Sequence, residues 1–339
     1  MTAKAGFGAA LLVALLCGTA PAEVCTTQSQ MQPPERSALA QTALDFARRV
    51  QGGDSSGIRS LTIAKYAQDF GGIASAIADT GSRIKGSSLQ VESIFLLDAS
   101  AVKAAGNGPD AAAAQFFCSL NQTAAETDFL IPGLPPGQYA FAVVSASGTA
   151  PWQLSFLFQQ EQGQWKMAGF YPKPLTAAGH DGLWYWTTAR SLVQQKHSWS
   201  AWLYYQQAET LLQPAGFVSS THFEKLRAEQ IAGAPPALSE GVSAEAPLVV
   251  KGKGDAEYHF TVLVTDDSFS KDKVDVVAHL KVDQVGDAAA ARKSNIEAMS
   301  ALLAAYPELR QSFHGVWIFA EAAGQSPVAT ELSMAEIPS

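Results

Sequence analysis

The chain has 339 residues, a formal net charge of −8, 47% hydrophobic residues and 16% charged residues. This composition excludes an intrinsically disordered chain, which would be poor in apolar residues and rich in charge. It also excludes a coiled coil or a collagen-like rod, because the 27 glycines follow no repeat and charged heptads are absent. The order of helical and strand-like patterns along the chain predicts packed domains of the α+β class.

The first 22 residues have the layout of a secretory signal. Lys4 is followed by an apolar run from Phe7 to Cys17 and then by small residues that end at Ala22. This order is typical of a cleaved signal peptide, and the apolar run is shorter than the about 20 residues that span a bilayer. We expect an exported protein, periplasmic or secreted, that begins at Glu23 and has no membrane span after cleavage. The short, Ala-rich signal favours a bacterial host.

Two cysteines remain after the predicted cleavage, Cys25 and Cys118. An oxidising compartment allows such a pair to form a disulfide. A catalytic thiol is not supported, because no histidine lies near either cysteine in the sequence and neither cysteine belongs to a C-x-x-C motif. We expect either a disulfide or two inert thiols.

Residues 36–174 predict one domain with helices first and a curved antiparallel sheet afterwards. Apolar residues recur at helical spacing in its first part and alternate at strand spacing in its second part. In the last two strands, the alternation that starts at Trp152 returns after a tight turn and continues to Tyr171. The predicted helices cover 37–50, 57–70 and 73–84, and the predicted strands cover 89–97, 113–120, 138–147, 152–158 and 165–171.

The closing hairpin resembles that of the NTF2-like superfamily. The resemblance covers about residues 36–174 and implies helices packed into the concave side of a strongly bent sheet, which forms a cone. Some members of this superfamily place an acidic base and a phenol inside the cone, whereas here the late strands offer no inward carboxylate. The residues that carry the resemblance are Trp152-x-Leu154-x-Phe156-x-Phe158 and the run from Gly163 to Tyr171. The acid and phenol candidates are Tyr66, Asp69, Asp128 and Tyr139, for which we expect packing or surface roles.

Residues 175–231 are helical from Asp181 to about Gln230. Small, small, aromatic, small and proline residues stand close to the positions typical of a tetratricopeptide-type helical hairpin, which the segment resembles; they are Ala189, Ala201, Tyr205, Ala208 and Pro214. One copy does not bury a continuous core, so we expect the hairpin to pack on its neighbours. Its second helix is apolar on more than one face and therefore needs two neighbours. Two interpretations stay open: a helical core wedged between domains, which we favour, and a ligand or partner surface. The aromatic residues of that surface would be Trp184, Trp186, Trp199, Trp202 and Tyr205.

Residues 232–246 are rich in Ala, Gly, Ser and Pro and predict a linker. A second small α+β domain is expected beyond it, and it is acidic, because residues 235–339 hold 15 acids and 8 bases. The absence of a basic surface studded with aromatic residues argues against a nucleic-acid partner. The predicted strands of the acidic domain cover 258–265, 274–281, 315–321 and 328–337, and its predicted helix covers 287–313. The predicted organisation is a signal peptide at 1–22, a tail at 23–35, the NTF2-like domain at 36–174, the helical hairpin at 175–231, the linker at 232–246 and the acidic domain at 247–339.

Two sequence motifs have simpler explanations than catalysis or metal binding. Residues 53–57 match G-x-S-x-G, but a helix precedes them where a nucleophile elbow needs a strand, so we expect a loop and an N-cap. The run from Asp266 to Asp275 alternates oxygen ligands but lacks the Gly and Glu of an EF-hand, so we expect a solvated charged hairpin. The histidines form no zinc motif. We therefore expect no metal and no cofactor.

These patterns favour a non-enzymatic binding or assembly module of the bacterial cell envelope, with a protein or small-molecule partner that the sequence does not identify. Two alternatives stay open: a small-molecule enzyme that uses the cone pocket, and a glycan binder that uses the tryptophans. A buried carboxylate inside the cone would favour the enzyme. Exposed, coplanar tryptophans would favour the glycan binder.

Overall fold

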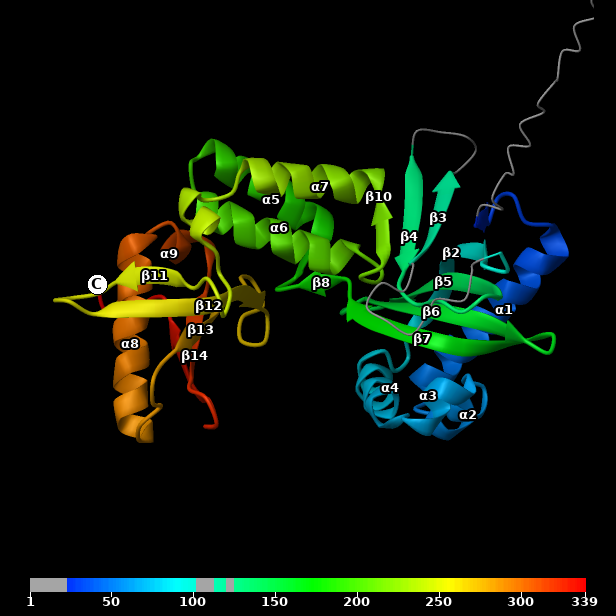
Figure 1. Ribbon diagram of the computed structural model, residues 1–339, viewed down its shortest axis with the longest axis horizontal. Coiled ribbons are helices and arrows are strands. Elements are labelled where there is room, and N and C mark those ends of the chain that lie inside the picture. The colour runs from blue at the N-terminus through cyan, green and yellow to red at the C-terminus, as the bar shows by residue number, and fades with distance from the viewer. Residues whose placement is uncertain (1–22, 102–112, 120–124) are drawn as a thin grey trace, which may run out of the picture.

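The computed structural model describes residues 23–101, 113–119 and 125–339, so the predicted signal peptide lies outside the described residues. The described chain is α+β. Figure 1 shows two units that combine helices and strands at opposite ends of the molecule, with a layer of helices between them. Within the described ranges, no helix has both the length and the apolar character needed to cross a membrane.

The N-terminal unit is built around a five-stranded antiparallel sheet with the order β1-β2-β5-β6-β7. Helices cover one face of this sheet, where Phe46 packs its ring against Phe156 and Phe158 at 6.0 and 5.1 Å between centroids. The strands are β1 (Val24–Thr27), β2 (Ser88–Asp98), β5 (Gln138–Ser147), β6 (Trp152–Glu161) and β7 (Gln164–Pro174). The helices are α1 (Pro33–Gln51), α2 (Ser55–Ser60), α3 (Ala64–Gln68) and α4 (Gly71–Arg83).

The helix predicted over 57–70 is wrong, because the chain forms two short helices with a break at Leu61–Ile63. At the break the backbone pairs with β7: Met167 N donates to Leu61 O at 2.8 Å, and Ile63 N donates to Met167 O at 3.0 Å. The backbone groups of Leu61 and Ile63 that bond to β7 are therefore not used in one continuous helix. The G-x-S-x-G match spans the turn before α2 and the first turn of that helix, where Asp54 accepts a hydrogen bond from Gly57 N, as expected for an N-cap.

The regular alternation predicted through the last hairpin to Tyr171 is also wrong. Leu157 pairs with Gly169 and Phe158 pairs with Met167, so Ala168 is an extra residue in β7. This bulge shifts the alternation by one residue. Met167 faces the helices, whereas Tyr171 packs on the opposite side of the sheet.

A second sheet covers that opposite side. It has three strands in the order β10-β4-β3, and Phe116, Phe129 and Val218 pack from it against Phe141 of β5. Its strands are β3 (Ala114–Ser119), β4 (Glu126–Ile131) and β10 (Val218–Ser220). Because β10 comes from the segment between two later helices, the helical layer supplies a strand to the N-terminal unit.

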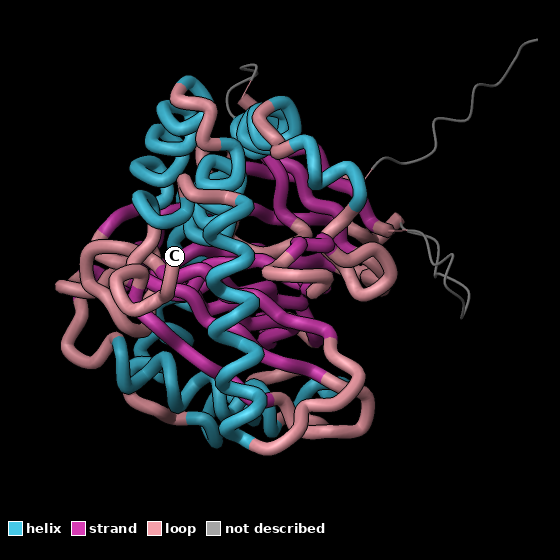
Figure 2. The backbone as a smooth tube through the Cα atoms, turned by 90° about the vertical axis from the view of Figure 1, so that its left-hand side faces the viewer, coloured by secondary structure: helices cyan, strands magenta, loops and turns pink. Residues whose placement is uncertain are grey.

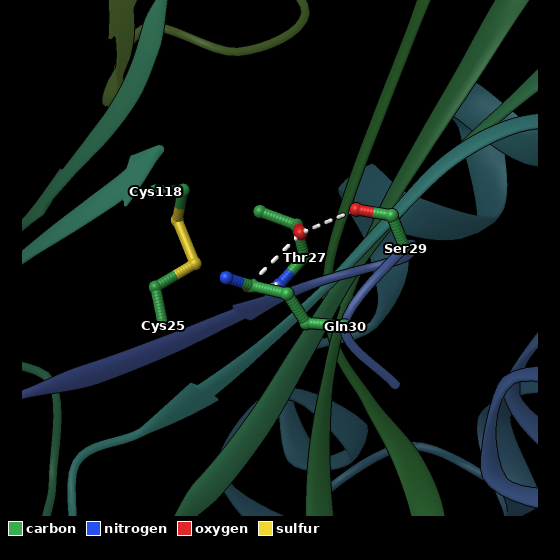
Figure 3. Close-up of a disulfide and its surroundings, with 5 residues drawn as sticks. All are labelled: Cys25, Thr27, Ser29, Gln30 and Cys118. Carbon is green, nitrogen blue, oxygen red and sulfur yellow. Dashed lines mark hydrogen bonds between the residues drawn. A yellow bond between two sulfur atoms is a disulfide. The ribbon is translucent and has the colours of Figure 1, made fainter. Parts of the chain in front are cut away.

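A disulfide between Cys25 and Cys118 joins β1 to β3, with 5.4 Å between the Cα atoms (Figure 3). It connects the edge strands of the two sheets across 93 residues of sequence. Directly after β1, the turn is held by Gln30, whose Oε1 accepts hydrogen bonds from Thr27 N and Thr27 Oγ1, both at 2.9 Å. The short first strand is thus fixed at both of its ends.

The helical layer consists of α5 (Gly182–Gln194), α6 (Ser198–Leu212) and α7 (Thr221–Ala232), and a small hairpin of β8 (Thr176–Ala177) and β9 (His180–Asp181) leads into it. Asp181 caps α5 by accepting a hydrogen bond from Trp184 N, and Ser220 caps α7 through Phe223 N. Gly182 allows close packing of α5 on α6, because a side chain there would meet Leu212.

The C-terminal unit has a five-stranded sheet with the order β11-β12-β13-β14-β15, in which only β13 and β14 are parallel. A parallel pair needs a crossover, which α8 provides; Figure 2 shows this helix running across the sheet. The predicted helix over 287–313 stops at Ala305, since Pro307 interrupts it. The strands are β11 (Leu248–Lys251), β12 (Glu257–Asp266), β13 (Asp275–Lys281), β14 (Gly315–Glu321) and β15 (Val328–Ser333). The helices are α8 (Ala288–Ala305) and α9 (Leu309–Ser312).

One hydrophobic core runs through both the helical layer and the C-terminal sheet. Trp199 packs against Tyr306 at 4.9 Å, and Tyr204 packs against Phe313 at 5.4 Å between ring centroids. The predicted linker at 232–246 contains a 3-10 helix, η2 (Pro236–Glu240), that contacts β11. The segment therefore connects two parts of the same core.

Candidate functional site

The structure does not bring the four acid and phenol candidates of the N-terminal unit together into one site. Tyr66 and Asp69 are exposed at α3 and just after it. Tyr139 is buried, its hydroxyl donates to Pro135 O at 2.8 Å, and burial raises its pKa to about 12. Asp128 lies on the outer face of the second sheet, opposite the exposed Phe117, and its pKa is raised by burial first and then by the carboxylates of Glu126 and Glu224.

The helix-covered face of the first sheet is filled with apolar side chains. Phe156, Phe158 and Ile77 are fully buried there and pack with other apolar side chains of the helices and strands. Among the described residues, Asp275 is the only carboxylate that is fully buried, and it belongs to the C-terminal unit. A general base would need a carboxylate within reach of a substrate, and the described residues of this face include no buried carboxylate.

Trp186 holds two helices together. Its indole Nε1 donates to Glu229 Oε2 of α7 at 2.8 Å, and the Arg190 guanidinium lies 4.6 Å from its ring. Arg190 also forms two hydrogen bonds to Glu229, at 2.7 and 2.9 Å, and these lower the pKa of that carboxyl. Since Trp186 is only 8% exposed, it acts as part of a clamp between α5 and α7.

Trp199 and Tyr205 are core residues, each 2% exposed. The ring of Trp202 stands at 86° to that of Trp199, with 5.7 Å between centroids, so these two rings are not coplanar. Trp202 is half-buried and borders an apolar groove of about 420 Å³ beside Ile231 and Pro235. Of the two interpretations of these aromatic residues, a helical core packed between domains therefore fits most of them better than a ligand or partner surface.

Trp184 differs from the other helical tryptophans because 38% of it is exposed. It borders a groove of about 430 Å³ between the helical layer and the C-terminal unit. The helical side of the groove includes His180, Thr188, His197 and Tyr204, and the other side is formed at 272–273 and 311–312. A concave site with an aromatic wall and a few polar groups is the usual form of a small-molecule site.

The walls of this groove are held by specific contacts. His180 stacks on Trp184 with 3.6 Å between centroids and 9° between planes, and Gly179 before it has φ +78° where it approaches Lys271 O. Tyr204 donates its hydroxyl to Ser312 O at 2.7 Å. On the opposite wall of the groove, which the C-terminal unit forms, Lys273 Nζ donates to Gln311 O at 2.8 Å.

The groove has polar groups but no ionised phenol at physiological pH. Burial raises the pKa of Tyr204 to about 12, and burial also raises the pKa of the neighbouring Tyr185, whose hydroxyl donates to Ala177 O. In the described part of the chain, no group of three or more His, Cys, Asp or Glu side chains is arranged to hold a metal. Such a groove can bind a ligand through hydrogen bonds and ring packing.

Asp275 and His314 form a pair that the sequence did not indicate. Asp275 Oδ1 lies 2.8 Å from His314 Nδ1, and Asp275 Oδ2 is buried without a hydrogen-bond partner among the described residues. The predicted solvated hairpin over 266–275 is therefore wrong at its last residue. The available signal was the position of Asp275 at the start of the apolar run that becomes β13.

The chain was compared with models of known protein families, with curated proteins and with solved structures, and none of them matches it.

Proposed function

We propose that this chain is an exported, non-enzymatic binding module of the bacterial cell envelope, and that the groove beside Trp184 is its ligand site. The observation that carries the proposal is the exposure of Trp184 at a polar groove, while Trp186, Trp199 and Tyr205 are buried. An exposed tryptophan in a concave site provides apolar contact and a hydrogen-bond donor to a ligand.

The proposed architecture is an NTF2-like unit, an aromatic helical hairpin of the tetratricopeptide type and a small acidic α+β unit. The five-stranded antiparallel sheet with helices on one face supports the first assignment, and the close packing of α5 on α6 supports the second. The filled helix-covered face argues against an enzyme that uses a cone pocket, because a substrate would find no space and no carboxylate there.

Export is proposed from the signal-like order of residues 1–22. The disulfide between Cys25 and Cys118 agrees with an oxidising compartment, where such bonds persist. The binding site would then act outside the cytoplasm, on a ligand or partner of the envelope.

A thermal-shift screen with a library of envelope metabolites tests the binding function. We expect ligands that raise the melting temperature of the wild type and have no effect on Trp184→Ala, and we expect mass spectrometry to recover them unchanged. The double variant Asp69→Asn and Asp128→Asn should respond like the wild type. If the wild type converts a ligand to a product and the double variant does not, the protein is an enzyme and the proposed binding function is wrong.

A further inference from the structure

We propose that the groove beside Trp184 takes a saccharide that is neutral or zwitterionic overall. This inference rests on the proposed function, since it names the ligand class of the same groove. It follows from three properties of the groove: the hydrogen-bonding groups that line it, its aromatic corner and its balance of charge.

Four residues lining the groove have polar side chains to which no other described protein group forms a hydrogen bond: His180, Thr188, His197 and Asp272. The carboxylate only accepts, the Thr188 hydroxyl can donate and accept, and each neutral imidazole offers one donor and one acceptor. A sugar presents several neighbouring hydroxyls that both donate and accept, so it can satisfy this mixed set. An apolar ligand would bury the same groups without partners, which costs free energy.

The aromatic corner of the groove provides the apolar contact that a sugar ring needs. Trp184 and Tyr204 lie with 6.0 Å between their ring centroids and 41° between their planes. His180 covers one face of Trp184 and fixes its orientation, while the exposed part of the indole borders the groove. The C–H faces of a pyranose are apolar, so they can pack in such a corner while the hydroxyls reach the polar wall.

The charges of the groove favour a ligand without a large net charge. Asp272 and Lys273 are adjacent and of opposite sign, and the whole chain carries −8. A nucleic acid or another polyanion would need a basic surface. The inference therefore selects an uncharged or zwitterionic glycan over anionic polymers.

The test follows the indole N–H signals of the full chain by NMR during titration with maltotriose, cellotriose and chitotriose, each up to about 10 mM. The signal of Trp184 is assigned by its loss in Trp184→Phe. We expect it to shift and saturate with at least one of the three sugars, and we expect Trp184→Ala and Asp272→Asn each to weaken binding about tenfold. Leu183→Ala is the matched control, because this neighbour is exposed but does not line the groove.

Triglycine and inorganic phosphate are titrated in parallel, so that the ligand class and the binding function fail in different ways. If triglycine or phosphate shifts the Trp184 signal and no sugar does, the saccharide inference is overturned and groove binding survives. If none of the probes shifts it, the saccharide inference falls together with the ligand role of Trp184. A sugar that binds without moving the Trp184 signal also contradicts the inference.

Discussion

Lys173 shows how one residue joins the N-terminal unit to the helical layer. Its Nζ donates to Thr210 O at 3.1 Å and to Leu211 O at 2.8 Å, at the carboxyl end of α6. A cation is favoured at a helix carboxyl end, but burial opposes the charged form. Burial is the cause that lowers the pKa of Lys173 to about 7.

This pKa predicts a dependence of stability on pH. In the unfolded chain Lys173 keeps its proton to about pH 10, whereas in the folded chain it loses the proton from about pH 7. Between these values the unfolded state binds more protons, so the free energy of unfolding contributed by this group rises with pH. Urea denaturation at several pH values from about 6 to 9 should give a steeper rise for the wild type than for Lys173→Met. Equal slopes would contradict the burial of this ammonium group.

Residue identity alone did not reveal which aromatic side chains are exposed. The sequence predicted a pair of aromatic helices whose second member is apolar on more than one face, and in the structure α5 and α6 pack against each other. It did not distinguish Trp184 from Trp199, because exposure depends on Tyr306 and other residues more than 100 positions away in the C-terminal unit. For the same reason the pairing of Asp275 with His314 could not be predicted from local patterns.

At the scale of elements, the strand β1 depends on the disulfide. It pairs with β2 over four residues only, and the bond from Cys25 to Cys118 ties it to the second sheet. Closing a chain segment of this length with a disulfide stabilises a fold by about 2 to 5 kcal/mol. The double variant Cys25→Ser and Cys118→Ser should lose that amount in chemical denaturation.

Reduction provides the control for this prediction. A phosphine reductant should lower the stability of the wild type to that of the double variant and should leave the double variant unchanged. If reduction of the wild type has no effect on the denaturation midpoint, β1 is held by its backbone pairing and not by the disulfide.

The first turn of α5 positions Trp184, because Asp181 Oδ1 accepts a hydrogen bond from Trp184 N at 2.8 Å. Removing an N-cap costs about 1 kcal/mol. Asp181→Ala should lose this amount and also increase the access of acrylamide to Trp184, measured by fluorescence quenching. The matched control is Asp287→Ala, which removes the N-cap of α8 and should cost a similar amount without changing the quenching. Equal quenching in both variants would show that Asp181 does not position Trp184.

Long elements were predicted closely and short ones were missed. The strands expected over 138–147 and 315–321 have the observed bounds, because their aromatic and β-branched content extends over most of each element. By contrast, β1, β4, β10 and β11 are short, and pairing with strands distant in sequence supports them more than their own residues do. The register of β7 from Ala168 onward could not be predicted, since a single bulge residue reverses which side chains face the core.

At the scale of the molecule, the helical layer connects both ends. It shares a hydrophobic core with the C-terminal sheet, and it contributes β10 to the N-terminal unit. Replacing a core aromatic residue of this layer should therefore affect the stability of the molecule, whereas replacing a residue of the groove should affect binding.

The most direct test of the account compares Trp184→Ala with Trp199→Ala for thermal stability and for binding of a groove ligand. We predict that Trp199→Ala loses about 3 to 5 kcal/mol of stability, because it empties a buried site, and that it keeps its affinity while folded. Trp184→Ala should keep the melting temperature of the wild type and lose the ligand. The account is contradicted if Trp184→Ala binds as the wild type does, or if the two variants lose stability equally.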